Sequence, residues 1–94
     1  MIKEFVWFRA CLVRRDSAMV SVFSPTAQFG PNIFEGLRGY WNDEDQDLFV
    51  VKLDLHINRL FESAKIVGLK NPFSANKIKA AIFDTLKKMI YAKM

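Results

Sequence analysis

Arg59 is the side chain of this sequence best suited to bind an anion. It lies in the run Leu55-His56-Ile57-Asn58-Arg59-Leu60, beside apolar residues at helical spacing, so its guanidinium can extend from the edge of a core. A guanidinium presents a planar fork of donors that suits phosphate, because it makes two charge-assisted hydrogen bonds at once. The alternative, which residue patterns alone favour, is a surface helix arginine paired with Asp54 or Glu62.

A second candidate feature is the stretch Ile33–Trp41, which alternates with period 2. Phe34, Gly36, Arg38 and Tyr40 then share one side of a strand, and the apolar residues between them share the other. Because a glycine stands between a large aromatic side chain and an arginine, this side leaves a recess with an apolar wall and a cationic rim. Such a recess suits a small ligand with an apolar body and an acidic end, although core packing explains Phe34 about equally well. Glu35 points to the opposite side and is interpreted as structural.

Other kinds of chemistry have little support in the sequence. His56 is the single histidine and has no Cys, His or carboxylate set at zinc spacing, so we interpret it as structural and expect no metal site. The serines lack an accompanying His-acid constellation, which argues against nucleophilic hydrolysis. The net charge is +4, but the lysines lie mostly on the outer side of the last predicted helix, where solvation explains them better than nucleic-acid binding does.

The composition of the chain predicts its cellular compartment, its number of domains and a partner surface. No apolar run approaches the roughly 18 residues of a membrane span, and the lone Cys11 suggests a reducing compartment, so we expect a cytoplasmic protein without a membrane partner. A chain of 94 residues is at most one domain. Its 51% hydrophobic content is more than so small a body can bury, which predicts a partner surface, either a second copy or a further domain.

The elements that position these residues can be read in order. Short strands are expected at 5–8, 11–13 and weakly at 18–22, with the Arg9-Ala10 turn type left open, and a turn or short helix at 26–32. Strands at 33–41 and 48–53 flank an acidic turn, and the second should be central or nearly central in its sheet because it is apolar on both faces apart from Lys52. Asp54 is the expected N-cap of a helix that ends at Gly68, and Ser74 caps a second helix whose apolar face runs from Ile78 to Ile90. The predicted class is α+β, an antiparallel sheet covered by two amphipathic helices.

Two runs in this order carry a family resemblance. Phe34-Glu35-Gly36-Leu37-Arg38, followed by Leu55-His56-Ile57-Asn58-Arg59-Leu60 and Ser63-Ala64-Lys65, resembles the class IV pyridoxal-phosphate aminotransferases, and among them the branched-chain amino acid aminotransferases. The similarity extends from about Phe5 to the last helix. It implies that residues 1–94 are part of an N-terminal small domain, and that the large domain with the catalytic lysine is absent from this chain.

The resemblance also implies roles for individual residues. Arg59 would hold the phosphate of pyridoxal 5'-phosphate, Phe34 would wall the aliphatic side chain of the substrate, Gly36 would leave room for it, and Arg38 would orient a second carboxylate or gate the pocket. Phe29 replaces a tyrosine that relatives direct toward a neighbouring subunit's pocket. No catalytic residue is expected in this chain, since none of its lysines lies in the motif of the lysine that bonds to the cofactor.

The implied parent reaction is amino-group transfer between a branched-chain amino acid and 2-oxoglutarate, in a homo-oligomer, and the 94-residue chain alone should be inactive. Two alternatives stay open. One keeps the fold and changes the chemistry, to a D-amino acid aminotransferase or an aminodeoxychorismate lyase. The other is a non-catalytic assembly module, which the excess of apolar residues and the missing lysine would explain.

Overall fold

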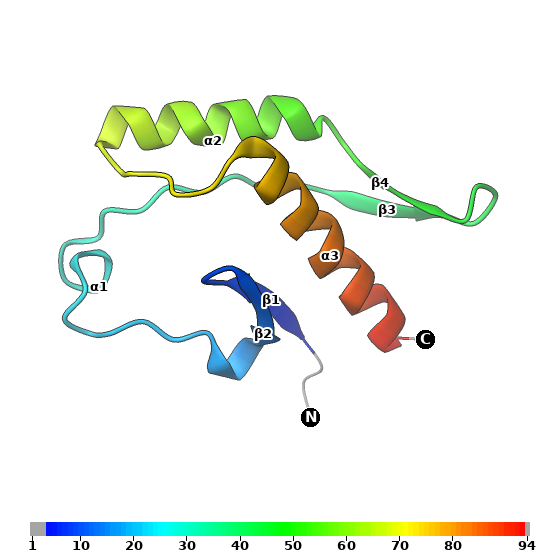
Figure 1. The fold of residues 1–94 in the computed structure, drawn as a ribbon, viewed down its shortest axis with the longest axis horizontal. Helices are drawn as coiled ribbons and strands as arrows, with labels where there is room; N and C mark the ends of the chain where they lie inside the picture. The colour runs from blue at the N-terminus through cyan, green and yellow to red at the C-terminus, as the bar shows by residue number, and fades with distance from the viewer. Residues whose placement is uncertain (1–3, 94) are drawn as a thin grey trace.

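The described part of the protein consists of two antiparallel hairpins, a connecting segment that contains two short helices, and two long helices (Figure 1). The computed structural model describes residues 4–93, with side chains through residue 89. In chain order the elements are β1 (Phe5–Phe8), β2 (Cys11–Arg14), the 3₁₀ helix η1 (Arg15–Ser17), α1 (Pro25–Phe29), β3 (Gly39–Asn42), β4 (Asp47–Val50), α2 (Leu53–Val67) and α3 (Ala75–Lys93). The α+β class is confirmed, but the described strands form two separate two-stranded sheets, β1-β2 and β3-β4.

The first hairpin turns through Arg9 and Ala10. Both residues have positive φ, 51° and 70°, as the two central positions of a type I′ turn require. The turn type that the sequence left open is therefore the tight one whose twist matches the flanking strands, in spite of side chains that disfavour it. Phe8 pairs with Cys11 directly beside the turn, and Phe5 pairs with Arg14 at the far end.

The segment between the hairpins is mostly irregular. The weak strand expected at 18–22 is absent; Met19 and Val22 are exposed, and the backbone turns where Ser21 Oγ accepts a hydrogen bond from Phe23 N. The expected short helix is present as α1. Its cap is Ser24, whose Oγ accepts from Ala27 N at 3.3 Å, and it ends at Gly30 with φ 78°.

The second hairpin is shorter than expected. The prediction of a strand over 33–41 is wrong for residues 33–38, because in the described part of the chain no strand pairs with them. The prediction for 48–53 fails at its end, since Lys52 adopts a left-handed conformation with φ 51° that turns the chain into α2. β4 is also not central: its partner is β3, and its other edge has none within residues 4–93.

Helix α2 follows the predicted apolar stripe. Ile57 and Ala64 are buried, whereas Val67 at the end of the stripe is exposed. The helix starts two residues earlier than expected, so Lys52 is the N-cap. Asp54, the predicted cap, lies in the first turn and pairs with Lys79 of α3. Gly68 ends the helix as predicted, with φ 76°.

Helix α3 packs across the N-terminal hairpin and reaches β3. Ser74 Oγ accepts from Lys77 N at 3.1 Å, so its predicted cap is confirmed. Ala81 is buried, and Trp7 of β1 stacks edge-on with Phe73 at 4.9 Å. A Cβ at Gly39 would lie 2.9 Å from Leu86 Cδ1, so the helix approaches β3 where a side chain is missing. The side chain of Ile90, also predicted for this face, lies outside the described part.

The molecule is flat and exposes much apolar surface. It measures 45 × 34 × 18 Å, with a radius of gyration of 14.9 Å, against about 12 Å for a compact domain of this length. Its accessible surface is 7612 Å², about 2,000 Å² more than a monomer of this mass normally has. Four described apolar residues are buried: Leu48, Ile57, Ala64 and Ala81. The predicted excess of apolar surface is confirmed.

Candidate functional site

The site is built around an ion pair between the extended segment 33–38 and α2. Arg59 holds Glu35 with two nitrogens: Nη2 lies 2.7 Å from Oε1, and Nε lies 3.1 and 3.2 Å from Oε1 and Oε2. The Glu35 side chain is 11% exposed and that of Arg59 is 66% exposed. The carboxylate is therefore nearly covered, whereas much of the guanidinium stays in solvent.

His56 completes this group of three side chains. It precedes Arg59 by three positions, so both lie on one face of α2. Its Nδ1 is 2.8 Å from Oε1 of Glu35 and 3.4 Å from Nη2 of Arg59. A carboxylate only accepts and a guanidinium only donates, so one ring nitrogen cannot bond to both. The shorter contact assigns the proton to Nδ1, which donates to Glu35, and confirms the structural interpretation of His56.

Glu35 and Arg59 each stabilise the charged form of the other. Hydrogen bonds from Arg59 and then from His56 lower the pKa of Glu35 below its ordinary value of 4.5. The hydrogen bond to Glu35 likewise raises the pKa of Arg59. At neutral pH the site consequently contains an ionised carboxylate and a permanently charged guanidinium.

The geometry leaves one edge of Arg59 available. Glu35 occupies the side that carries Nε, together with one proton of Nη2. Among the described residues, Nη1 makes no hydrogen bond, so Nη1 and the second Nη2 proton point away from Glu35 as a two-donor edge. Through this edge Arg59 can still donate two hydrogen bonds to a phosphate or carboxylate that approaches end-on.

The alternation predicted for 33–38 is present although the strand is not. Ile33, Glu35 and Leu37 are partly buried, whereas Phe34, Gly36 and Arg38 are exposed. Glu35 therefore points to the side opposite Phe34, Gly36 and Arg38, as predicted, and that side faces α2.

A recess lined by Gly36 and Arg38 lies on the exposed side, without the wall of Phe34 that the sequence predicted. A solvent-open pocket of about 360 Å³, here called the Gly36 recess, is lined by Gly36, Arg38, Tyr40, Val51 and His56. A Cβ at Gly36 would meet no atom within 4 Å. Phe34 is 86% exposed and does not line this recess, so its core-packing alternative is wrong, and its role as a substrate wall stays a prediction.

Arg59 lies next to the Gly36 recess but does not line it. His56 lines the Gly36 recess, and Arg59 lies one helical turn further along α2, held by the neighbour of Gly36 in the chain. The alternative pairing of Arg59 with Asp54 or Glu62 is wrong, since Glu35 is the partner. That contact had no local signal, because it joins residues 24 positions apart.

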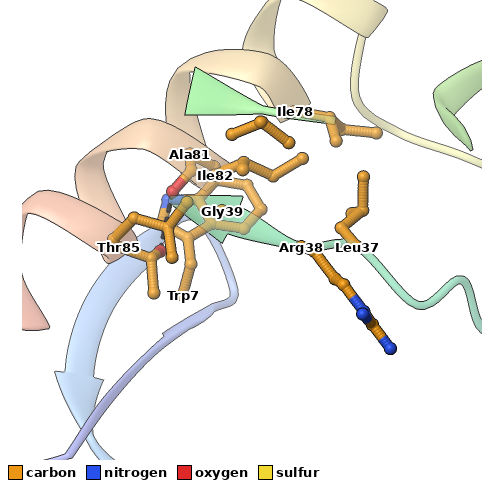
Figure 2. A pocket seen from close by; sticks show the side chains of 10 residues that line it. Trp7, Leu37, Arg38, Gly39, Ile78, Ala81, Ile82 and Thr85 are labelled. Atoms are coloured by element: carbon orange, nitrogen blue, oxygen red, sulfur yellow. Dashed lines mark hydrogen bonds between the residues drawn. The ribbon is translucent and has the colours of Figure 1, made fainter. Parts of the chain in front are cut away.

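A second pocket lies between α3 and the two hairpins (Figure 2). Its volume is about 340 Å³, and its lining is mostly apolar, with Trp7, Ile78 and Ala81 among the residues shown. The Thr85 hydroxyl donates to Ala81 O at 2.7 Å, and the Arg38 side chain points away from the apolar cluster. This pocket therefore offers no polar group to orient an anionic ligand.

The described residues contain neither a candidate metal site nor a candidate membrane span. Between residues 4 and 93, no three or more His, Cys, Asp and Glu side chains are grouped to hold a metal ion. No helix in that range is long and apolar enough to cross a bilayer.

Comparison with known proteins identifies a group of enzymes, although no family model matches the chain. The chain is 32% identical over 85 residues to the branched-chain-amino-acid aminotransferase of Escherichia coli K12, covering 90% of this chain and 27% of that protein. It is 28% identical over 85 residues to the probable branched-chain-amino-acid aminotransferase of Aquifex aeolicus, with the same coverage.

The fold agrees. The crystal structure of the branched-chain aminotransferase from Thermoproteus uzoniensis with norvaline superposes with a TM-score of 0.82 and 40% identity, over 90% of this chain and 28% of that one. The chain thus spans about a quarter of the length of these relatives. The chain is thus similar to one part of the branched-chain-amino-acid aminotransferases.

Proposed function

We propose that this chain contributes the phosphate-binding arginine and one wall of the substrate pocket to a pyridoxal-phosphate-dependent branched-chain aminotransferase. The reaction would move an amino group between a branched-chain amino acid and 2-oxoglutarate. The observation that carries the proposal is the two-donor edge of Arg59, held in place beside the Gly36 recess in a chain similar to one part of these enzymes.

The residues present fit the phosphate end of the cofactor. Arg59 offers two parallel N–H donors and a permanent charge in partial solvent, the chemistry that phosphate binding uses. The cofactor itself, when bound, would supply the electron sink for amino-group transfer. The lysine that bonds to the cofactor is expected outside these 94 residues.

The recess fits one side of an amino acid. Gly36 leaves space, Val51 contributes an apolar surface, and Arg38 supplies a cation at the rim. A branched aliphatic side chain would occupy the space above Gly36, and Arg38 would attract a second carboxylate such as that of 2-oxoglutarate. Phe34, exposed nearby in the chain, is proposed to contact the same side chain in the assembled enzyme.

The phosphate role is tested with pyridoxine 5'-phosphate and pyridoxine. Neither has the aldehyde that would react with surface lysines, so their difference in affinity reports the phosphate contact alone. Arg59→Ala should lower the affinity for pyridoxine 5'-phosphate roughly ten- to hundredfold, because two charge-assisted hydrogen bonds are lost. The affinity for pyridoxine should not change.

The matched control is Arg15→Ala. Arg15 is also an exposed arginine in an ion pair, with Glu4 at 2.9 Å, but it lies in η1, directly after the N-terminal hairpin. The Arg15→Ala substitution removes the same charge as Arg59→Ala, and it should leave the affinities for pyridoxine 5'-phosphate and pyridoxine unchanged. Equal loss in the two variants would reduce the effect to net charge, and no loss in Arg59→Ala would reject the phosphate role.

The two alternative functions are not equally supported. The relatives named above are all branched-chain aminotransferases, so a D-amino acid aminotransferase or an aminodeoxychorismate lyase is not favoured. The exposed apolar surface favours an assembly role in addition to catalysis, with the remaining enzyme or a second copy as the partner. If the 94-residue chain with cofactor catalysed the transfer by itself, our view of it as one contributing part would be wrong.

A further inference from the structure

We infer that Glu35 is a positioning residue for anion binding: its carboxylate holds the guanidinium of Arg59 so that the outer donor edge is presented to a phosphate. The inference rests on the proposed function of Arg59 and adds a residue that acts through it. Glu35 itself would touch neither cofactor nor substrate.

The contacts support a rigid arrangement. Three Arg59–Glu35 hydrogen-bond contacts between 2.7 and 3.2 Å fix both the position and the plane of the guanidinium. Glu35 is in turn held from a second direction by Nδ1 of His56 at 2.8 Å. Because the carboxylate is 11% exposed, water competes little for it. An arginine that is 66% exposed would otherwise sample many rotamers.

Two opposite effects of Glu35 on an anion can be compared. Its negative charge repels a phosphate, so charge alone predicts tighter binding when Glu35 becomes neutral. Its hydrogen bonds order the Arg59 side chain before the ligand arrives, so positioning predicts weaker binding when they are lost. The sign of the change in affinity therefore separates the two roles.

His56 gives the arrangement a second use. Since its Nδ1–H donates to Glu35, the same carboxylate orients the imidazole that lines the Gly36 recess. One side chain thus fixes both the anion-binding arginine and one wall of the recess. The same contacts tie the extended segment 33–38 to α2, and at the end of this segment Arg38 O accepts a hydrogen bond from Val51 N at 3.0 Å.

The test compares Glu35→Gln with Glu62→Gln, using pyridoxine 5'-phosphate and pyridoxine. Glu62 is an exposed glutamate on α2, so its substitution removes the same charge without removing a contact to Arg59. Glu35→Gln should weaken binding of the phosphate compound roughly three- to tenfold, the scale of immobilising one long side chain, and leave pyridoxine unchanged. Glu62→Gln should be neutral or slightly tighter.

Each outcome decides between the roles. Unchanged or tighter binding of pyridoxine 5'-phosphate by Glu35→Gln, while Arg59→Ala loses it, would overturn the positioning role and leave the proposed function intact. No preference for the phosphate compound in the wild-type chain, or no effect of Arg59→Ala, would overturn both.

A measurement on the wild-type chain does not depend on how the variants fold. ¹⁵N relaxation of the Arg59 Nε–H should show a side chain about as ordered as the backbone of α2. Arg9, which is exposed and whose guanidinium contacts only the Phe8 ring among the described residues, should be more mobile. Glu62→Gln should keep this order and Glu35→Gln should lose it. Mobility of Arg59 equal to that of Arg9 in the wild type would overturn the inference by itself.

Discussion

Replacing Ile57 by alanine tests whether the packing of α2 positions the site. Ile57 is 2% exposed, and it lies between His56 and Arg59 in the sequence, on the buried face of the helix. The substitution removes three carbon atoms, a transfer cost of about 2.4 kcal/mol at about 0.8 kcal/mol per methylene. The cavity left behind adds to this, so we expect a loss of about 3–4 kcal/mol in the free energy of unfolding.

This loss is large for the chain. A 94-residue domain has a free energy of unfolding of roughly 5–14 kcal/mol. The extended shape and small core suggest the lower part of that range. Ile57→Ala should therefore remove about half of the stability, and it should weaken the binding of pyridoxine 5'-phosphate at temperatures near the unfolding midpoint.

Ile66→Ala is the matched control on the same helix. Ile66 is 84% exposed, so the same three carbons leave water-covered surface and the free energy of unfolding should change by less than about 0.5 kcal/mol. Urea unfolding followed by circular dichroism at the helix band measures both variants. Equal losses at the two positions would refute the packing of α2 described here, because only Ile57 is buried in it.

Three further predictions concern charge and backbone. Since the pKa of Glu35 is lowered in the folded chain, its stabilising contribution is complete above the ordinary value of 4.5 and is lost as the pH falls through the folded pKa; the difference in unfolding midpoint between wild type and Glu35→Gln should therefore shrink as the pH falls below 4.5. A difference that instead grows in acid would contradict the ion pair with Arg59. Gly68→Ala should lower the free energy of unfolding by about 1–2 kcal/mol, because its φ of 76° is left-handed, and an unchanged value in denaturant titration would contradict that conformation. Gly36→Ala should leave stability unchanged or raise it slightly by the same titration, because a Cβ there meets nothing within 4 Å; a loss above about 1 kcal/mol would show that the recess is filled.

Local features of the fold were predictable from the sequence. Ser74 as a cap, Gly68 as a helix end and the buried positions Ile57 and Ala64 depend on residues a few places apart, so their signals are contained in short windows. The segment 33–38 was misjudged because its alternation is real but its backbone finds no strand partner in the described chain. Alternation reports which side is buried and says nothing about what covers it.

The partner of Arg59 could not be predicted in the same way. The sequence offered Asp54 and Glu62, which are helical neighbours, whereas the structure uses Glu35 from across a turn and a hairpin. Asp54 instead pairs with Lys79 on α3.

The sequence alone determined the residue types that could bind an anion, the sides on which they lie, and the kind of enzyme they resemble, because those depend on composition and short spacing. The tertiary structure decided how the guanidinium is held, which edge of it remains for a ligand, and that His56 lines the recess. These depend on how α2 lies against the extended segment, a contact between residues distant in the chain that the hydrogen bonds of Arg59 and His56 to Glu35 stabilise.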